Sequence, residues 1–173
     1  MEPENIYLIG LMGVGKTTIG KQLAKALKRP FYDSDKAIEQ ITGVDIPTIF
    51  EFEGEAGFRD REQKMILQLT MLQGIVLATG GGAILREENR MALKQTGFVV
   101  YLKCSVDRIL ERTRRDTQRP LLQTENPRER INCLFHQREP LYLACADYQV
   151  DTGATQNKVV INRILEKYSL RSQ

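Results

Sequence analysis

Tryptophan is absent from this sequence of 173 residues, histidine occurs once and cysteine three times. An odd number of cysteines cannot complete a disulfide framework, and Cys104, Cys133 and Cys145 lack the paired spacing of a zinc site. We therefore expect free thiols in a reducing compartment, which favours the cytoplasm. The single histidine, His136, is expected at the surface or at a helix cap rather than in catalysis.

Long apolar runs are also absent, since no stretch approaches the roughly 20 residues that a membrane-spanning helix needs. Residues 1–5 read MEPEN and are acidic, whereas a signal peptide begins with basic residues. We therefore expect no membrane association. Hydrophobic residues make up 42% of the chain and charged residues 27%, as in ordinary globular proteins. A chain of this length buries one core, so residues 1–173 are expected to form a single domain, which we expect to be a monomer.

A strong charge imbalance is absent too, because the net charge is only +3. The basic residues are nevertheless concentrated in residues 103–138, which hold nine lysines and arginines against five acidic residues. Such a concentration suits either nucleic acid or a small anionic ligand. The aromatic residues that would stack on bases do not accompany it, so we expect a polyphosphate ligand and no nucleic acid.

Residues 10–17, with the sequence GLMGVGKT, have the spacing of a phosphate-binding loop. They follow an apolar run and precede a segment with helical periodicity, which is the strand–loop–helix context that such a loop requires. Glycines let successive backbone N–H groups turn toward phosphate oxygens, and the N-terminus of the following helix favours negative charge. Lys16 is expected to contact the β- and γ-phosphates, and the Thr17 hydroxyl to bind Mg²⁺.

Apolar strand-like runs alternate with amphipathic helical segments along the rest of the chain. Strands are expected at residues 6–10, 31–33, 75–78, 98–102 and 148–150. Helices are expected at residues 16–28, 55–72, 86–95, 127–144 and 159–170, with further helices near Ser34, Pro47 and Ser105. Several strands are apolar without alternation, as is typical of buried parallel strands. The sequence therefore predicts a parallel, doubly wound α/β sandwich in which ligands bind at the carboxyl ends of the strands.

Two polar segments directly follow predicted strands. After the second strand, one carboxylate of Asp33 and Asp35 could act on the hydration shell of Mg²⁺, while the other accepts a hydrogen bond from a substrate hydroxyl. The alternative is a turn in which Ser34 or Asp35 caps a helix. Residues 79–82, Thr-Gly-Gly-Gly, follow the third strand, and their glycines would let a ligand approach the backbone closely. A tight turn is the alternative there.

Residues 113–126 are polar, rich in arginine and without periodicity, which is typical of a mobile loop. Arg119 in this loop is a candidate to close over a triphosphate and neutralise its charge. Arg138 would suit bidentate recognition of a carboxylate. Each of these arginines, like Arg59 in the predicted helix 55–72, has a solvated surface charge as its alternative.

Taken together, these segments resemble shikimate kinases. The resemblance rests on the motifs GLMGVGKT (10–17), DSD (33–35), GFR (57–59), GGG (80–82), RPLL (119–122) and REPLY (138–142). The phosphate loop alone is shared with many ATPases and GTPases, whereas the combination is far more selective, and the resemblance covers essentially the whole chain. It implies a P-loop kinase fold similar to that of nucleoside monophosphate kinases: a three-layer α/β/α sandwich around a parallel sheet of about five strands.

The resemblance also implies an activity, the ATP-dependent phosphorylation of the 3-hydroxyl of shikimate on the route to chorismate and aromatic amino acids. The catalytic residues would be Asp35, Lys16 and Arg119, with Asp35 as the base. The ATP-binding residues would be Gly13, Val14, Gly15, Lys16, Thr17, Thr18, Arg112 and Arg119, with Arg112 against adenine. The shikimate-binding residues would be Asp35, Arg59, Gly81 and Arg138. One Mg²⁺ would be held by Thr17 and, through water, by Asp33.

The resemblance places the acceptor-binding region at about residues 34–62 and the lid at about residues 113–126. A contact of Thr155 or Gln156 with adenine is left open. The alternative within enzymes is a P-loop kinase for another acceptor, such as gluconate or a nucleoside monophosphate. Asp35 would repel an acceptor phosphate, which disfavours the monophosphate. A nucleotide-dependent regulatory protein is the alternative from another class, but the Asn-Lys-x-Asp motif for guanine is missing.

Overall fold

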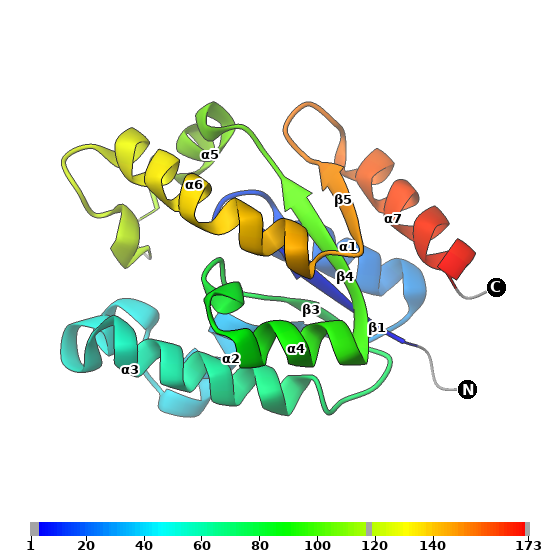
Figure 1. Ribbon diagram of the computed structural model, residues 1–173, viewed down its shortest axis with the longest axis horizontal. Helices are drawn as coiled ribbons and strands as arrows, with labels where there is room; N and C mark the ends of the chain where they lie inside the picture. The colour runs from blue at the N-terminus through cyan, green and yellow to red at the C-terminus, as the bar shows by residue number, and fades with distance from the viewer. Residues whose placement is uncertain (1–3, 117–118, 172–173) are drawn as a thin grey trace.

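The computed structural model describes residues 4–116 and 119–171 (Figure 1). Its centre is a sheet of five parallel strands in the order β2-β3-β1-β4-β5. The strands are β1 (Asn5–Ile9), β2 (Phe31–Asp33), β3 (Val76–Ala78), β4 (Gly97–Lys103) and β5 (Tyr148–Asp151). The predicted parallel α/β fold is therefore confirmed.

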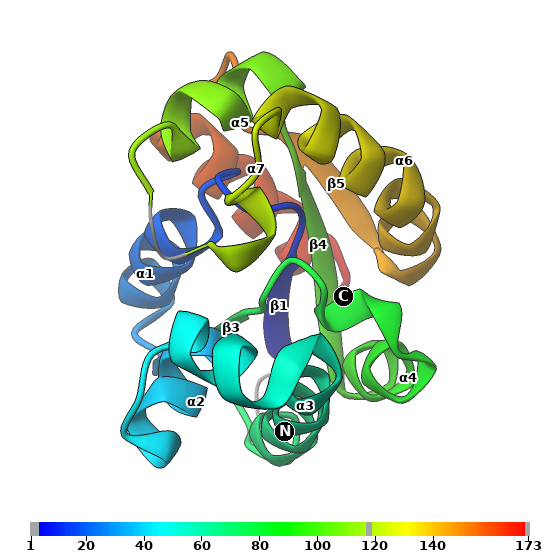
Figure 2. The same ribbon diagram turned by 90° about the vertical axis from the view of Figure 1, so that its left-hand side faces the viewer.

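Helices cover both faces of this sheet (Figures 1 and 2). They are α1 (Lys16–Leu27), α2 (Ser34–Thr42), α3 (Ile46–Leu69), α4 (Glu87–Thr96), α5 (Val106–Thr113), α6 (Pro127–Cys145) and α7 (Asn157–Arg171), with the 3₁₀ turns η1 (Ala83–Leu85) and η2 (Pro120–Leu122). On one face α1 contacts α7; on the other α4 contacts both α3 and α6. This is the predicted three-layer sandwich. None of the helices in the described ranges is both long and apolar enough to cross a membrane.

The three central strands, β1, β3 and β4, are largely apolar on both sides because helices cover both faces of the sheet. Every residue of β1 is buried, as are all but the last residue of β4. The end of β3 is tied to β1 by Thr79, whose backbone N–H and hydroxyl both donate to the carbonyl of Leu8, at 3.1 and 3.0 Å. This tie brings the segment after β3 beside the phosphate loop after β1.

The predicted interruption at Gly54 is confirmed, because its backbone is not helical (φ 70°, ψ −178°) and divides α3 into two helical parts. Two other local expectations need correction. The N-cap of α2 is Asp33 rather than Ser34 or Asp35, because its carboxylate accepts from the N–H groups of Asp35 and Lys36, at 3.0 and 3.2 Å. The segment 113–126 is not without structure, since it contains the turn η2 and buries the side chain of Leu122.

Helix α1 packs closely on the sheet at Gly20, which leads to a first prediction. A Cβ at this position would lie 2.5 Å from the Phe31 ring and 3.3 Å from a methyl group of Leu8. Gly20→Ala should therefore destabilise the protein by about 1–3 kcal/mol despite the better helix propensity of alanine. Urea unfolding would measure the change. In a Phe31→Leu background the same substitution should cost much less; an equal cost in both backgrounds would contradict the packing argument.

Candidate active site

The phosphate loop joins β1 to α1 in a conformation that requires glycine. Gly10, Gly13 and Gly15 have φ values of 147°, 78° and 102°, in the region that side chains disfavour. At Gly10 the space is closed as well, since a Cβ would lie 2.5 Å from the carbonyl oxygen of Leu102. The loop thus ends on the N-terminus of α1, which favours a bound anion.

The outer side of this loop is braced by hydrogen bonds to its carbonyl groups. Arg112 donates to the carbonyls of Gly13 and Val14, each at 3.1 Å, and to the carbonyl of Thr152 at 3.2 Å. The buried Thr152 hydroxyl donates to the Val14 carbonyl at 2.8 Å. Arg112, expected against adenine, therefore lies between the phosphate loop and the end of β5. Thr152 was missed, although its position after β5 could have indicated it.

Lys16 is the first residue of α1, and its side chain turns back into the phosphate loop. Its ammonium group donates to the carbonyls of Gly10 and Leu11, the second at 2.8 Å. Burial lowers the pKa of Lys16 to about 7, and Arg119 acts in the same direction, whereas Asp35 and Asp33 oppose the shift. The negative charge of a bound phosphate group would stabilise the charged form of Lys16, which burial disfavours.

Thr17 and Asp33 are in contact beside the phosphate loop. The Thr17 hydroxyl donates to the Asp33 carboxylate at 2.7 Å. The other carboxylate oxygen of Asp33 is the one that caps α2, so the strand end, the helix and the phosphate loop are joined at one side chain. The described residues contain no group of three or more His, Cys, Asp or Glu side chains that would hold a metal ion alone.

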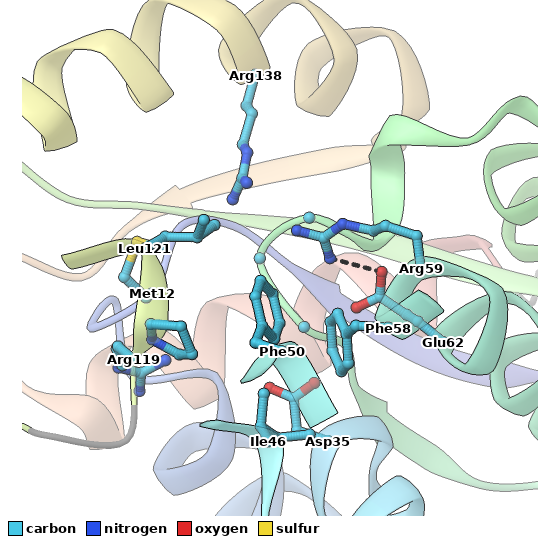
Figure 3. A pocket seen from close by; sticks show the side chains of 14 residues that line it. Met12, Asp35, Ile46, Phe50, Phe58, Arg59, Glu62, Arg119, Leu121 and Arg138 are labelled. Atoms are coloured by element: carbon cyan, nitrogen blue, oxygen red, sulfur yellow. Dashed lines mark hydrogen bonds and ion pairs between the residues drawn. The ribbon is translucent and has the colours of Figure 1, made fainter. Parts of the chain in front are cut away.

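Asp35 lies in the first turn of α2 and points into the adjoining pocket (Figure 3). Burial raises the pKa of its carboxyl group to about 7, and the negative charges of Glu62 and Asp33 add to the shift. Its Oδ1 atom is buried and has no hydrogen-bond partner among the described residues. Asp35 is therefore poised to exchange a proton near neutral pH.

This acceptor pocket is lined by five charged side chains, a glycine segment and an apolar wall (Figure 3). The charged residues are Asp35, Arg59, Glu62, Arg119 and Arg138. Each of them except Arg119 has one buried polar atom without a hydrogen-bond partner in the described part of the chain. Since buried polar groups are almost always paired, such a concentration indicates a site for a polar ligand.

Arg138 is the most unusual of these residues, because its side chain is 2% exposed yet it forms no ion pair with any described residue. Burial lowers the pKa of its guanidinium, which nevertheless stays charged at neutral pH. An unpaired buried charge is unfavourable unless a ligand compensates it. Arg138 therefore indicates a binding position for an anion.

Arg59, by contrast, has protein partners. It donates to Glu62 at 2.8 Å and to Glu55 at 3.3 Å, and only the first of these carboxylates is buried. Burial raises the pKa of Glu62, while Arg59 opposes the shift. Glu62 was missed in the sequence, although its spacing of three residues from Arg59 on a helix could have indicated the pair.

The glycines of residues 80–82 bring the backbone against these charged groups. A Cβ on Gly80 would lie 2.7 Å from Glu62 and 2.8 Å from Asp35. On Gly81 it would lie 3.4 Å from the Arg138 guanidinium, and on Gly82 2.3 Å from that of Arg59. The segment does form a turn, in which the Ala83 N–H donates to the Gly80 carbonyl at 3.0 Å, but none of the three glycines has a positive φ, so the turn itself does not require glycine. Their role is close approach.

The acceptor pocket and the pocket around the phosphate loop share a wall. The second pocket is lined by the loop residues Gly13, Gly15, Lys16, Thr17 and Thr18, together with Asp33 and Arg112. Six residues line both pockets: Met12, Asp35, Ile46, Gly80, Gly81 and Arg119. A group held against the phosphate loop therefore lies next to a group held in the acceptor pocket, which is the arrangement that phosphoryl transfer requires.

Arg119 reaches this shared wall from the segment predicted to be the lid. It forms an ion pair with Asp116 at 2.7 Å, while the following Pro120 and Leu121 line the acceptor pocket. Thr155 and Gln156 lie in the loop between β5 and α7, at least partly exposed. Residues 117 and 118 of the predicted lid lie outside the described residues.

Comparison with known proteins gives relatives that match almost the whole chain. The family model for shikimate kinase matches residues 12–169. A shikimate kinase of Methylococcus capsulatus is 56% identical over 164 residues, which are 95% of this chain and 92% of that protein. One from Thioalkalivibrio sulfidiphilus is 56% identical over 99% of this chain and 90% of that protein.

Solved structures of shikimate kinases are also similar to this chain. The structure of shikimate kinase from Acinetobacter baumannii in complex with shikimate is 48% identical, with a TM-score of 0.95 over 98% of this chain and 94% of that one. A gluconokinase from Sinorhizobium meliloti has a TM-score of 0.55 and 16% identity over 99% of this chain and 98% of that one, which shows a shared fold alone. With its sequence matched almost from end to end, this chain belongs to the shikimate kinase family.

Proposed function

We propose that this protein transfers the γ-phosphoryl group of ATP to the 3-hydroxyl of shikimate. The observation that carries the proposal is the acceptor pocket, where the unpaired guanidinium of Arg138 and the carboxylate of Asp35 enter from different elements (Figure 3). Such a pocket suits a molecule with a carboxylate and a hydroxyl group. Its wall is shared with the phosphate pocket, so the hydroxyl end lies beside the phosphoryl donor.

On the donor side, backbone N–H groups of residues 13–18 bind the phosphates of ATP, and Arg112, in the last turn of α5, lies close enough to reach the nucleotide. Lys16 exchanges its two carbonyl partners for phosphate oxygens, and Arg119 adds a second positive charge. These charges offset the negative charge that spreads over the transferring group. The protein thus contributes mainly position and electrostatic stabilisation.

On the acceptor side, Arg138 and Arg59 bind the carboxylate of shikimate, and Gly81 lets the substrate approach the backbone. Asp35 accepts the hydrogen bond of the reacting hydroxyl and takes its proton as the new phosphate ester forms. Because its pKa is near 7, Asp35 is ionised in a substantial fraction of molecules at neutral pH. Glu62 keeps Arg59 in position through their ion pair.

The residues present fit one Mg²⁺ that arrives with ATP. Thr17 and Asp33 lie in contact at the phosphate loop. They offer only two oxygen ligands, which suits Mg²⁺ because this ion keeps several water and phosphate ligands when a protein binds it. The ion would be held by Thr17 directly and by Asp33 through water. It supplies charge neutralisation at the phosphates.

The segment 113–126 acts as a lid in this proposal, because a dry site keeps water from taking the phosphoryl group. Leu121 and Pro120 already line the acceptor pocket from this segment. The region 34–62 forms most of the opposite wall. The enzyme acts as a monomer in the cytoplasm, on the route to chorismate and aromatic amino acids.

The first test is acceptor dependence. Purified protein with Mg-ATP should release ADP only when shikimate is added, and shikimate 3-phosphate should form in an equal amount. Coupled ADP detection and mass spectrometry of the product would measure both. ADP release that does not depend on an acceptor, or that responds to gluconate and not to shikimate, would contradict the proposal.

A second prediction concerns the base. Asp35→Asn keeps the shape of the side chain but removes its basicity, so kcat should fall by roughly 10²–10⁴-fold. ATP binding, measured by calorimetry, should persist, because Asp35 belongs to the acceptor side. Asp60→Asn, an exposed aspartate on α3, is the matched control and should keep full turnover. Loss of ATP binding in Asp35→Asn would remove Asp35 from the acceptor site.

A third prediction follows from the raised pKa of Asp35. The carboxylate is the active form, so kcat/KM for shikimate at saturating ATP should rise with pH and level off above about 7. The Glu62 charge is one cause of this shift. In Glu62→Gln the inflection should therefore move to lower pH, whatever the loss in substrate binding. An unmoved inflection would show that another group controls the profile.

A further inference from the structure

Tyr142 is a buried residue of α6 that no step of the mechanism above uses. It follows Arg138 by four residues, which puts both side chains on the same face of the helix. The side chain is 1% exposed, and its ring stacks on Tyr101 with 4.9 Å between ring centroids and 21° between ring planes. Packing therefore fixes the direction of its hydroxyl group.

That hydroxyl lies where two predicted substrate-binding residues meet. It donates a hydrogen bond to the carbonyl of Gly81, and the Arg138 guanidinium lies close enough to oppose the rise in the pKa of Tyr142 that burial causes. Arg138 itself lies close to Gly81, as a Cβ there would be 3.4 Å from its guanidinium nitrogen. Tyr142 thus connects a side chain of α6 to the glycine segment after β3.

A phenol has suitable chemistry for this position. Burial raises the pKa of Tyr142, although Arg138 opposes the shift, so the hydroxyl keeps its proton and can donate to Gly81. Its lone pairs remain available to the guanidinium. A carboxylate here would neutralise Arg138 and compete with an anionic substrate, whereas a neutral oxygen orients the guanidinium and leaves its charge uncompensated.

The bond to Gly81 also fixes the backbone that follows. A trans peptide is planar, so holding the carbonyl of Gly81 holds the N–H of Gly82 in the opposite direction. Both glycines line the acceptor pocket. A single hydroxyl therefore controls the orientation of one guanidinium and one peptide group of the same wall.

We propose that Tyr142 is a positioning residue for the carboxylate end of the acceptor pocket, acting through Arg138 and the peptide between Gly81 and Gly82. It does not touch the transferring phosphoryl group. This inference rests on the proposed function, because shikimate is the ligand whose binding it affects.

The test is Tyr142→Phe, which removes one oxygen and keeps the stacked ring. The KM for shikimate should rise by roughly tenfold, since a buried carbonyl and a guanidinium each lose a partner. The KM for ATP should change far less, because neither Tyr142 nor Arg138 lines the phosphate pocket. The control is Tyr101→Phe, which alters the other ring of the same stack and should leave both constants unchanged. Thermal unfolding would compare the stability of the variants.

A double-mutant cycle with Arg138→Lys tests the route of the effect. If Tyr142 acts through Arg138, the loss in kcat/KM for shikimate caused by Tyr142→Phe should be much smaller in the Arg138→Lys background. Fully additive losses would overturn the route through Arg138.

Three other results would overturn the inference. They are an unchanged KM for shikimate in Tyr142→Phe, an equal rise in both KM values together with lower stability, and the same rise in Tyr101→Phe. A wild-type protein that does not phosphorylate shikimate would overturn the proposed function and this inference with it. Normal wild-type turnover with an unaffected Tyr142→Phe variant would overturn this inference alone.

Discussion

The site depends on one constraint, the burial of charged side chains against the glycine backbone of residues 80–82. Asp35, Glu62, Arg59 and Arg138 all approach residues 80–82, and the first three occupy space that a Cβ on Gly80 or Gly82 would need. Of the two arginines, one is compensated by a carboxylate and one is not. An uncompensated guanidinium is unfavourable in the folded protein, so this arrangement trades stability for a pocket that is complementary to an anion before the anion arrives.

Much of this site could be predicted because its functional segments come directly after strands in the sequence. The phosphate loop, Asp33 with Asp35, and the glycine segment each follow a predicted strand, and parallel strands place their carboxyl ends on one edge. The apolar runs without alternation correctly predicted the buried strands β3 and β4. The glycines of residues 80–82 meet protein groups closely, while the approach of a ligand to them stays a prediction. Pattern alone was sufficient there, because local sequence and sheet topology determine those positions.

What the sequence did not predict depends on how helices pack. Thr152 and Tyr142 act through backbone carbonyls of other segments, and no local pattern identifies such a partner. Glu62 differs, because its partner Arg59 lies three residues earlier on the same helix. The cap of α2 was assigned one or two residues too late for a related reason. Asp33 ends a strand, caps a helix and accepts from Thr17, and only the three-dimensional arrangement makes one residue sufficient for all three. The turn η2 was missed because its burial comes from packing against α3 and α6.

The charges of the pocket do not by themselves distinguish shikimate from gluconate, since both are hydroxylated carboxylic acids. The apolar part of the pocket wall does distinguish these two acids. Phe50 and Phe58 lie with ring centroids 5.0 Å apart and, with Ile46, form an apolar surface in the acceptor pocket. A ring that carries its polar groups at the edge can place an apolar face there, whereas an open-chain polyol would bury hydroxyl groups against it without partners. Each unpaired group costs about 1–3 kcal/mol, so this wall favours the cyclic acceptor.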